Sequence, residues 1–121
     1  MLIPYENRKI FLASQPVDFR MSIDGLSQFI QKSNGTHIHE GAVYVFYKAL
    51  QDKIKCLFWD RNGFVLYYKR LDKCKFKLRK MLNSLESITP EYLEILLSGF
   101  DPEQSQRKPV LLESYQHKDQ A

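Results

Sequence analysis

The chain has 121 residues, of which 44% are hydrophobic and 26% are charged, and this composition is typical of a folded globular protein rather than of a disordered or fibrous one. A chain of this length can bury a core without disulfides or a structural metal, and nothing in the composition calls for a cofactor. Charge interrupts the first residues and no apolar run reaches the roughly 18 residues of a membrane-spanning helix, so we expect a cytoplasmic protein that does not enter the membrane.

The formal net charge is +4, but the basic residues are concentrated in one part of the chain. Residues 48–80 contain eleven Lys or Arg and three acidic residues, a local charge of +8, whereas the remainder carries −4. Such an asymmetry indicates a polyanionic partner. Cys56 and Cys74 lack Cys-x-x-Cys spacing, and we expect them to be reduced core thiols rather than a disulfide.

The first third of the chain changes from strand to helix periodicity. Residues 10–13 form a short apolar run ended by a proline, which predicts a first strand. Ile23, Leu26, Phe29 and Ile30 then fall at helical spacing before Ser33-Asn34-Gly35, so a helix is expected over about 21–32. Gly25 lowers its helix propensity, so either this glycine is closely packed or the helix begins later.

Three strand-like runs follow at 42–47, 54–59 and 64–70. They predict an antiparallel meander, in which the second connection carries Asn62-Gly63, a pair whose tolerance of positive φ suits a tight hairpin. We expect Phe46, Leu57, Trp59, Leu66 and Phe76 to contribute to the core.

Residues 72–80 alternate cleanly between apolar and basic side chains. As a strand, this stretch would place Cys74, Phe76 and Leu78 on one face and a row of four cations on the other. A second helix is expected over about 90–98, because Thr89-Pro90-Glu91 has the pattern of a helix start and Gly99 that of a stop.

These elements predict an α+β fold, with a mostly antiparallel sheet of four to five strands around a central meander and two helices packed on it. We expect residues 1–100 to form one domain. The polar residues 101–121 are expected to be a flexible tail or a segment that docks on a partner.

Three stretches carry a family pattern by their order and spacing. They are Ile10–Ala13 with Pro16–Arg20 and Ile23–Leu26; Gly41–Phe46; and Lys55–Asp60 with Gly63–Leu71. Over roughly its first hundred residues the chain therefore resembles the small TnpB-type accessory protein carried by bacterial insertion sequences of family sixty-six. The helix that ends at Gly99 matches the usual ending of that family.

The resemblance implies that the chain is encoded in a mobile genetic element beside a DDE-type transposase, which supplies the strand-transfer chemistry. We accordingly expect a non-catalytic accessory factor in DNA transposition, with that transposase as a partner. The sequence leaves a homo-oligomer open.

Candidate catalytic groups are few, and we expect no enzyme. Two-metal strand transfer needs converging carboxylates, and Asp18, Asp24 and Asp60 are the available trio, although each stands where Asp commonly caps a helix or a turn. His37, His39 and Glu40 lack further ligands for a metal site, so a solvated loop is the better interpretation.

A small metal-independent ribonuclease is the less favoured enzymatic alternative. Tyr67, Tyr68, Lys69 and Arg70 have suitable chemistry for it, but they alternate between the two faces of one strand and cannot all converge.

The basic stretch points to DNA-backbone contact, because Lys and Arg that neutralise phosphates supply most non-specific affinity. The expected DNA-binding residues are Lys53, Lys55, Lys69, Arg70, Lys73, Lys75, Lys77 and Arg79. The alternatives are a solvated face that protects an edge strand and a protein adapter that binds the transposase without contacting DNA.

Overall fold

Five strands and two helices make up the described part of the chain, which comprises residues 8–34, 41–78 and 85–103 of the computed structural model. In chain order they are β1 (Lys9–Ala13), α1 (Ile23–Asn34), β2 (Ala42–Tyr47), β3 (Lys53–Asp60), β4 (Gly63–Arg70), β5 (Leu85–Ile88) and α2 (Pro90–Leu97). The predicted α+β fold, with its mostly antiparallel sheet and two helices, is confirmed.

The strands form one sheet in the order β4-β3-β2-β1-β5. The predicted meander is present, since β2, β3 and β4 pair antiparallel in succession. β1 runs parallel to β2, and α1 lies in the connection between them, because parallel neighbours need a long crossover. β5 pairs antiparallel with β1 at the far edge.

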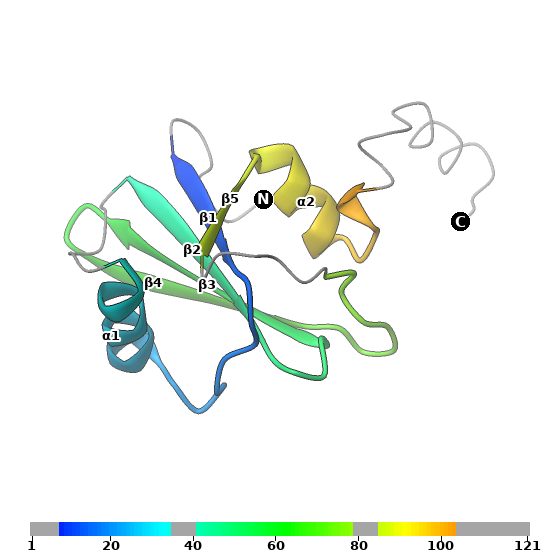
Figure 1. The fold of residues 1–121 in the computed structure, drawn as a ribbon, viewed down its shortest axis with the longest axis horizontal. Coiled ribbons are helices and arrows are strands. Elements are labelled where there is room, and N and C mark those ends of the chain that lie inside the picture. Colours follow the sequence, from blue (N-terminus) through cyan, green and yellow to red (C-terminus); the bar gives the residue numbers. More distant parts are fainter. Residues whose placement is uncertain (1–7, 35–40, 79–84, 104–121) are drawn as a thin grey trace.

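The sheet is covered on both faces, by α1 on one side and by α2 on the other (Figure 1). Leu26 and Ile30 of α1 pack on Tyr44 and Phe46, whereas α2 packs on Val43, Val45 and neighbouring strands. All six residues of β2 are buried, which explains its unbroken apolar sequence. The two faces are called the α1 face and the α2 face below.

The predicted core residues fall into two groups. Phe46, Leu57 and Phe76 are buried as expected. Leu66 is partly buried against the α1-face cluster. Trp59 is also only partly buried, near the β3–β4 hairpin, where its ring meets Phe64 edge-on with 5.0 Å between centroids.

The two ends of α2 agree with the sequence pattern. The Thr89 side chain accepts a hydrogen bond from the backbone N–H of Tyr92 and caps α2, and Gly99 after its end has a φ of 90°. α1 begins at Ile23, later than the expected residue 21. A Cβ on Gly25 would lie 3.1 Å from Met21 Cβ, so this glycine is also closely packed.

The β3–β4 hairpin differs in detail from the expected Asn-Gly turn. Asp60 pairs with Gly63, so the loop consists of Arg61 and Asn62, and the positive φ of 51° falls on Arg61. Gly63 instead begins β4.

The strand expected over 72–80 is wrong for the described residues 72–78, which have no strand structure. Alternation of apolar and basic residues was its only support, and the burial does not follow that alternation throughout, because Cys74 is exposed. The fifth strand is β5, which the sequence did not predict. Both thiols are free, and Cys56 is buried in the core as expected, but the expectation that Cys74 is a core thiol is wrong because Cys74 is exposed.

The sequence places a domain boundary at residue 100, and this boundary stays a prediction. Residues 104–121 of the expected tail lie outside the described part of the chain. Within the described residues, no helix is long and apolar enough to cross a membrane.

Candidate nucleic-acid interface

The stretch that follows β4 is fixed to the end of the sheet by its backbone. Leu71 N–H donates to the carbonyl of Asp52 (2.8 Å) and Phe76 N–H to the carbonyl of Gln51 (2.7 Å). The Phe76 side chain is buried in the α2-face core. The β2–β3 loop and one aromatic anchor thus hold residues 71–78 without strand pairing.

The loop that provides these carbonyls has an unusual backbone. Gln51 has a φ of 63°, and its N–H donates to the carbonyl of Lys48 at 2.7 Å. A non-glycine residue in this region is uncommon and costs conformational energy. The bend directs the Gln51 carbonyl to the Phe76 N–H.

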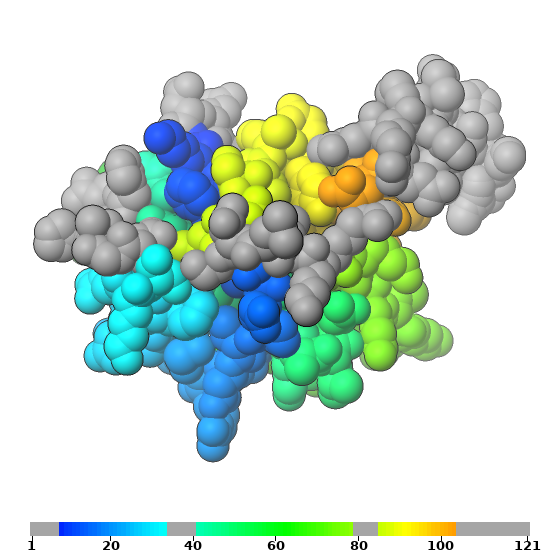
Figure 2. All heavy atoms as spheres, in the orientation of Figure 1, coloured from blue at the N-terminus to red at the C-terminus, as the bar shows by residue number. Residues whose placement is uncertain are grey.

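Four basic side chains are exposed on this stretch. Arg70 ends β4, and Lys73, Lys75 and Lys77 follow it, with Asp72 as the only acidic residue among residues 70–78. We call residues 70–78 the basic segment. Figure 2 shows its light-green atoms near the orange turn that follows α2. Because Phe76 is buried between Lys75 and Lys77, the packing leaves both lysines at the surface.

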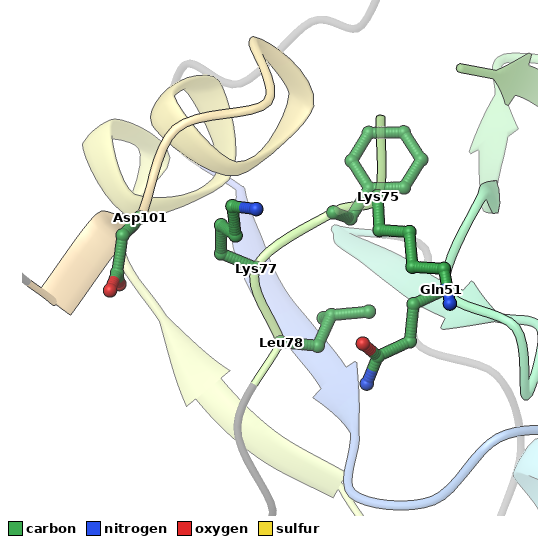
Figure 3. A pocket seen from close by; sticks show the side chains of 6 residues that line it. Gln51, Lys75, Lys77, Leu78 and Asp101 are labelled. Carbon is green, nitrogen blue, oxygen red and sulfur yellow. The ribbon is translucent and has the colours of Figure 1, made fainter. Parts of the chain in front are cut away.

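An open cavity of about 360 Å³ lies between the basic segment and neighbouring loops (Figure 3). Its lining consists of Gln51, Lys75, Phe76, Lys77, Leu78 and Asp101. The lining carries two lysine ammonium groups and one aspartate carboxylate, so the cavity has a net positive charge, like the basic segment beside it.

Three of the predicted contact residues have partners within the protein. Lys53 Nζ lies 3.0 Å from Asp52 Oδ2, and this contact lowers the pKa of the Asp52 carboxyl. Lys69 Nζ donates to the carbonyl of Leu97 (2.8 Å), where it satisfies an acceptor and places a positive charge at the C-terminus of α2.

Lys55 is the most deeply buried of these cations, at 6% exposure. Its Nζ donates to the carbonyls of Phe19 (2.9 Å) and Met21 (2.7 Å), and lies 4.8 Å from the centroid of the Phe19 ring and 5.6 Å from that of Tyr68. Burial lowers the pKa of this ammonium, against the opposing field of Asp18. Lys55 fastens the β1–α1 connection to the sheet and is not placed to bind phosphate.

The structure therefore brings together only part of the predicted set. The strand register places Lys53, Lys55 and Arg70 on the α1 face and Lys69 on the α2 face. Arg70, Lys73, Lys75 and Lys77 remain exposed, and Arg79 lies outside the described residues. Gln51 and Asp101 also line the cavity of this site, and the sequence analysis did not predict them. No local sequence pattern reveals contacts between loops that are distant in the chain.

The candidate catalytic groups do not form a centre among the described residues. No three His, Cys, Asp or Glu side chains in that part of the chain are grouped to hold a metal ion. The expected His37, His39 and Glu40 loop lies outside it. Of the ribonuclease candidates, Tyr67 and Lys69 lie on the α2 face, whereas Tyr68 and Arg70 lie on the α1 face.

Asp18 instead has a local partner. Arg20 donates to both carboxylate oxygens, with Nη2 at 2.6 Å from Oδ2, and these hydrogen bonds lower the Asp18 pKa to about 2.

Arg20→Ala is expected to return the Asp18 pKa toward its ordinary value, as measured by carboxyl NMR titration. The pair contributes stability above the ordinary pKa and loses it as the pH falls through about 2. An unchanged Asp18 titration in Arg20→Ala would contradict this account.

The chain is similar to a known protein family and to proteins of a bacterium. The model of the family described as IS66 Orf2 like protein matches residues 8–107. The chain is 31% identical over 110 residues to the uncharacterized protein y4jC of Sinorhizobium fredii (strain NBRC 101917 / NGR234), covering 91% of this chain and 94% of that protein. A second uncharacterized protein of that strain, y4hO, is 28% identical over 101 residues, covering 84% and 88% of the two chains. No solved structure matches the chain.

Proposed function

The chain belongs to the IS66 Orf2-like family, and from this premise we propose that it assists transposition of its insertion sequence by binding the DNA backbone through the basic segment. The family implies the accessory role in an insertion sequence. The observation that supports the DNA contact is the exposure of four basic side chains within eight residues, on a segment fixed by the buried Phe76. They are Arg70, Lys73, Lys75 and Lys77.

The fixed backbone favours this role. Phosphate contacts position a protein on DNA without reading its sequence, and lysines on an anchored segment lose less conformational freedom on binding than lysines on a mobile one. The proposed binding is therefore electrostatic and tolerant of sequence.

The test is a series of DNA-binding measurements at increasing salt, on element-end and unrelated duplexes. If the four cations each neutralise one phosphate, the plot of log affinity against log salt should have a slope of about −3.6. Lys75→Ala should flatten that slope by about 0.9 on both duplexes, whereas Lys32→Ala, an exposed lysine on α1, should leave it unchanged. A slope near zero would rule out backbone contact.

The second candidate function is a protein adapter for the transposase. Its support is the exposure of two large apolar side chains, Leu50 (58%) and Phe100 (38%), adjacent in sequence to the cavity-lining Gln51 and Asp101. An adapter would keep its affinity for the transposase when the lysines of the basic segment are changed to alanine and lose it in Leu50→Glu. The same salt series with and without the cognate transposase distinguishes the two functions.

A further inference from the structure

The two edges of the sheet are built differently. β5 at one edge has four residues, including Glu86, and such short, charged strands discourage pairing with another chain. β4 at the other edge has eight residues, Gly63–Arg70, without a proline. Its first six residues carry no charge. In the described part of the chain, no strand pairs with its outer side.

The register shows which residues of β4 have backbone N–H and C=O groups that point away from β3. Asp60 and Gly63 close a two-residue hairpin loop, and the closing pair of such a hairpin shares both of its hydrogen bonds. Since the pattern alternates along the ladder, Phe64, Leu66 and Tyr68 direct their N–H and C=O groups away from β3. The edge thus offers a ladder of donors and acceptors.

The side chains along this edge are also apolar. Tyr68 is 53% exposed and Val65 is 37% exposed, which makes them two of the exposed large hydrophobic residues of the described chain. Phe64, Leu66 and Tyr68 share the α1 face, whereas Val65 and Tyr67 share the α2 face. Either row can extend the corresponding core of a neighbouring sheet.

From these features we propose that β4 is a dimerisation edge, at which a second copy of this chain adds its own β4 antiparallel to the first. A two-fold axis perpendicular to the sheet near Leu66 and Tyr67 keeps the α1 faces of both copies on one side and sets the row of Phe64, Leu66 and Tyr68 beside its counterpart. The interface is self-complementary, as a two-fold contact requires.

The charges of β4 determine the direction in which a second copy can pair. Lys69 and Arg70 are the charged residues of β4, and both stand at its C-terminal end. Parallel pairing of two copies would set like charges side by side, which destabilises a sheet. Antiparallel pairing separates them and brings each basic end to the other copy's hairpin, where Asp60 and Arg61 balance in charge.

The experiment is sedimentation of the full chain over roughly 1 to 100 µM, because dimerisation depends on concentration. The wild-type chain should sediment at twice its 14.3 kDa mass at the upper concentrations. Val65→Lys, which places a charge on the edge, should weaken dimerisation about tenfold or more. The matched control is Ala49→Lys, an equally charged change at an exposed apolar residue of the β2–β3 loop, which should dimerise as the wild type does.

A second variant tests the backbone directly. Tyr68→Pro removes an N–H that points outward, so it costs no internal ladder bond and should still fold as judged by circular dichroism, yet it should be monomeric. A wild-type chain that is monomeric throughout, or Val65→Lys and Ala49→Lys variants that dimerise equally, would overturn the proposal. A monomer whose β4 variants lose the transposase would also overturn it, and would assign this edge to the transposase.

Discussion

Replacing Phe46 with alanine is expected to lower the free energy of unfolding by about 3–5 kcal/mol, a large part of the stability of a small domain. Phe46 is fully buried near the C-terminal end of β2, and its ring meets Phe29 of α1 edge-on with 5.8 Å between centroids. The substitution removes the aromatic contact between the sheet and α1 and leaves a cavity that a close-packed core cannot fill.

Denaturant unfolding followed by circular dichroism measures this loss. Leu50→Ala is the matched control, because Leu50 is 58% exposed and its truncation should change the free energy of unfolding by less than about 0.5 kcal/mol. If Phe46→Ala and Leu50→Ala cost the same, the α1-face core is not what stabilises the fold.

The meander could be predicted from the sequence because its signals are local. Each strand is a short run rich in β-branched and aromatic residues, and polar loops separate the runs. The positive φ at Arg61 could not be predicted, because Asn62-Gly63 is the more usual turn pair and the pairing of Asp60 with Gly63 depends on the register of the whole ladder.

The edge of the sheet opposite β4 could not be predicted for the same reason. β5 has four residues, Leu85–Ile88, and becomes a strand by pairing with β1, which is distant in sequence. The alternation near Lys75 and Phe76 was the stronger local signal. In the structure, this segment does not form a strand. One buried aromatic residue, Phe76, and two backbone hydrogen bonds to the β2–β3 loop hold it against the sheet.

The candidate site shows a further limit of sequence patterns. Lysine clustering identified Lys73, Lys75 and Lys77 on the surface, but it also selected Lys55 and Lys69. A long lysine side chain can cross an apolar surface and satisfy a backbone carbonyl elsewhere. Charge counting cannot separate a cation that caps a helix from one that faces solvent, because the acceptor belongs to a distant part of the chain.

Reversing two charges of the basic segment, Lys73→Glu with Lys77→Glu, is expected to weaken DNA binding by about sixtyfold or more at roughly 0.1 M salt. Each neutralised phosphate contributes about 0.9 logarithmic units of affinity between 1 M and 0.1 M salt, so two lost contacts remove about 1.8 units, and the added carboxylates repel the backbone further. Both side chains are exposed, so the fold should not change.

The matched control for this variant is Lys9→Glu with Lys32→Glu, which changes the net charge equally at exposed positions on β1 and α1. Thermal unfolding of both variants shows whether the fold is intact. The proposal requires binding to fall far more for the pair at 73 and 77 than for the pair at 9 and 32. Equal losses would mean that affinity follows net charge alone, since a field spread over the whole protein does not depend on where the charges lie. Unchanged binding by a folded variant at 73 and 77 would leave the transposase adapter as the better account.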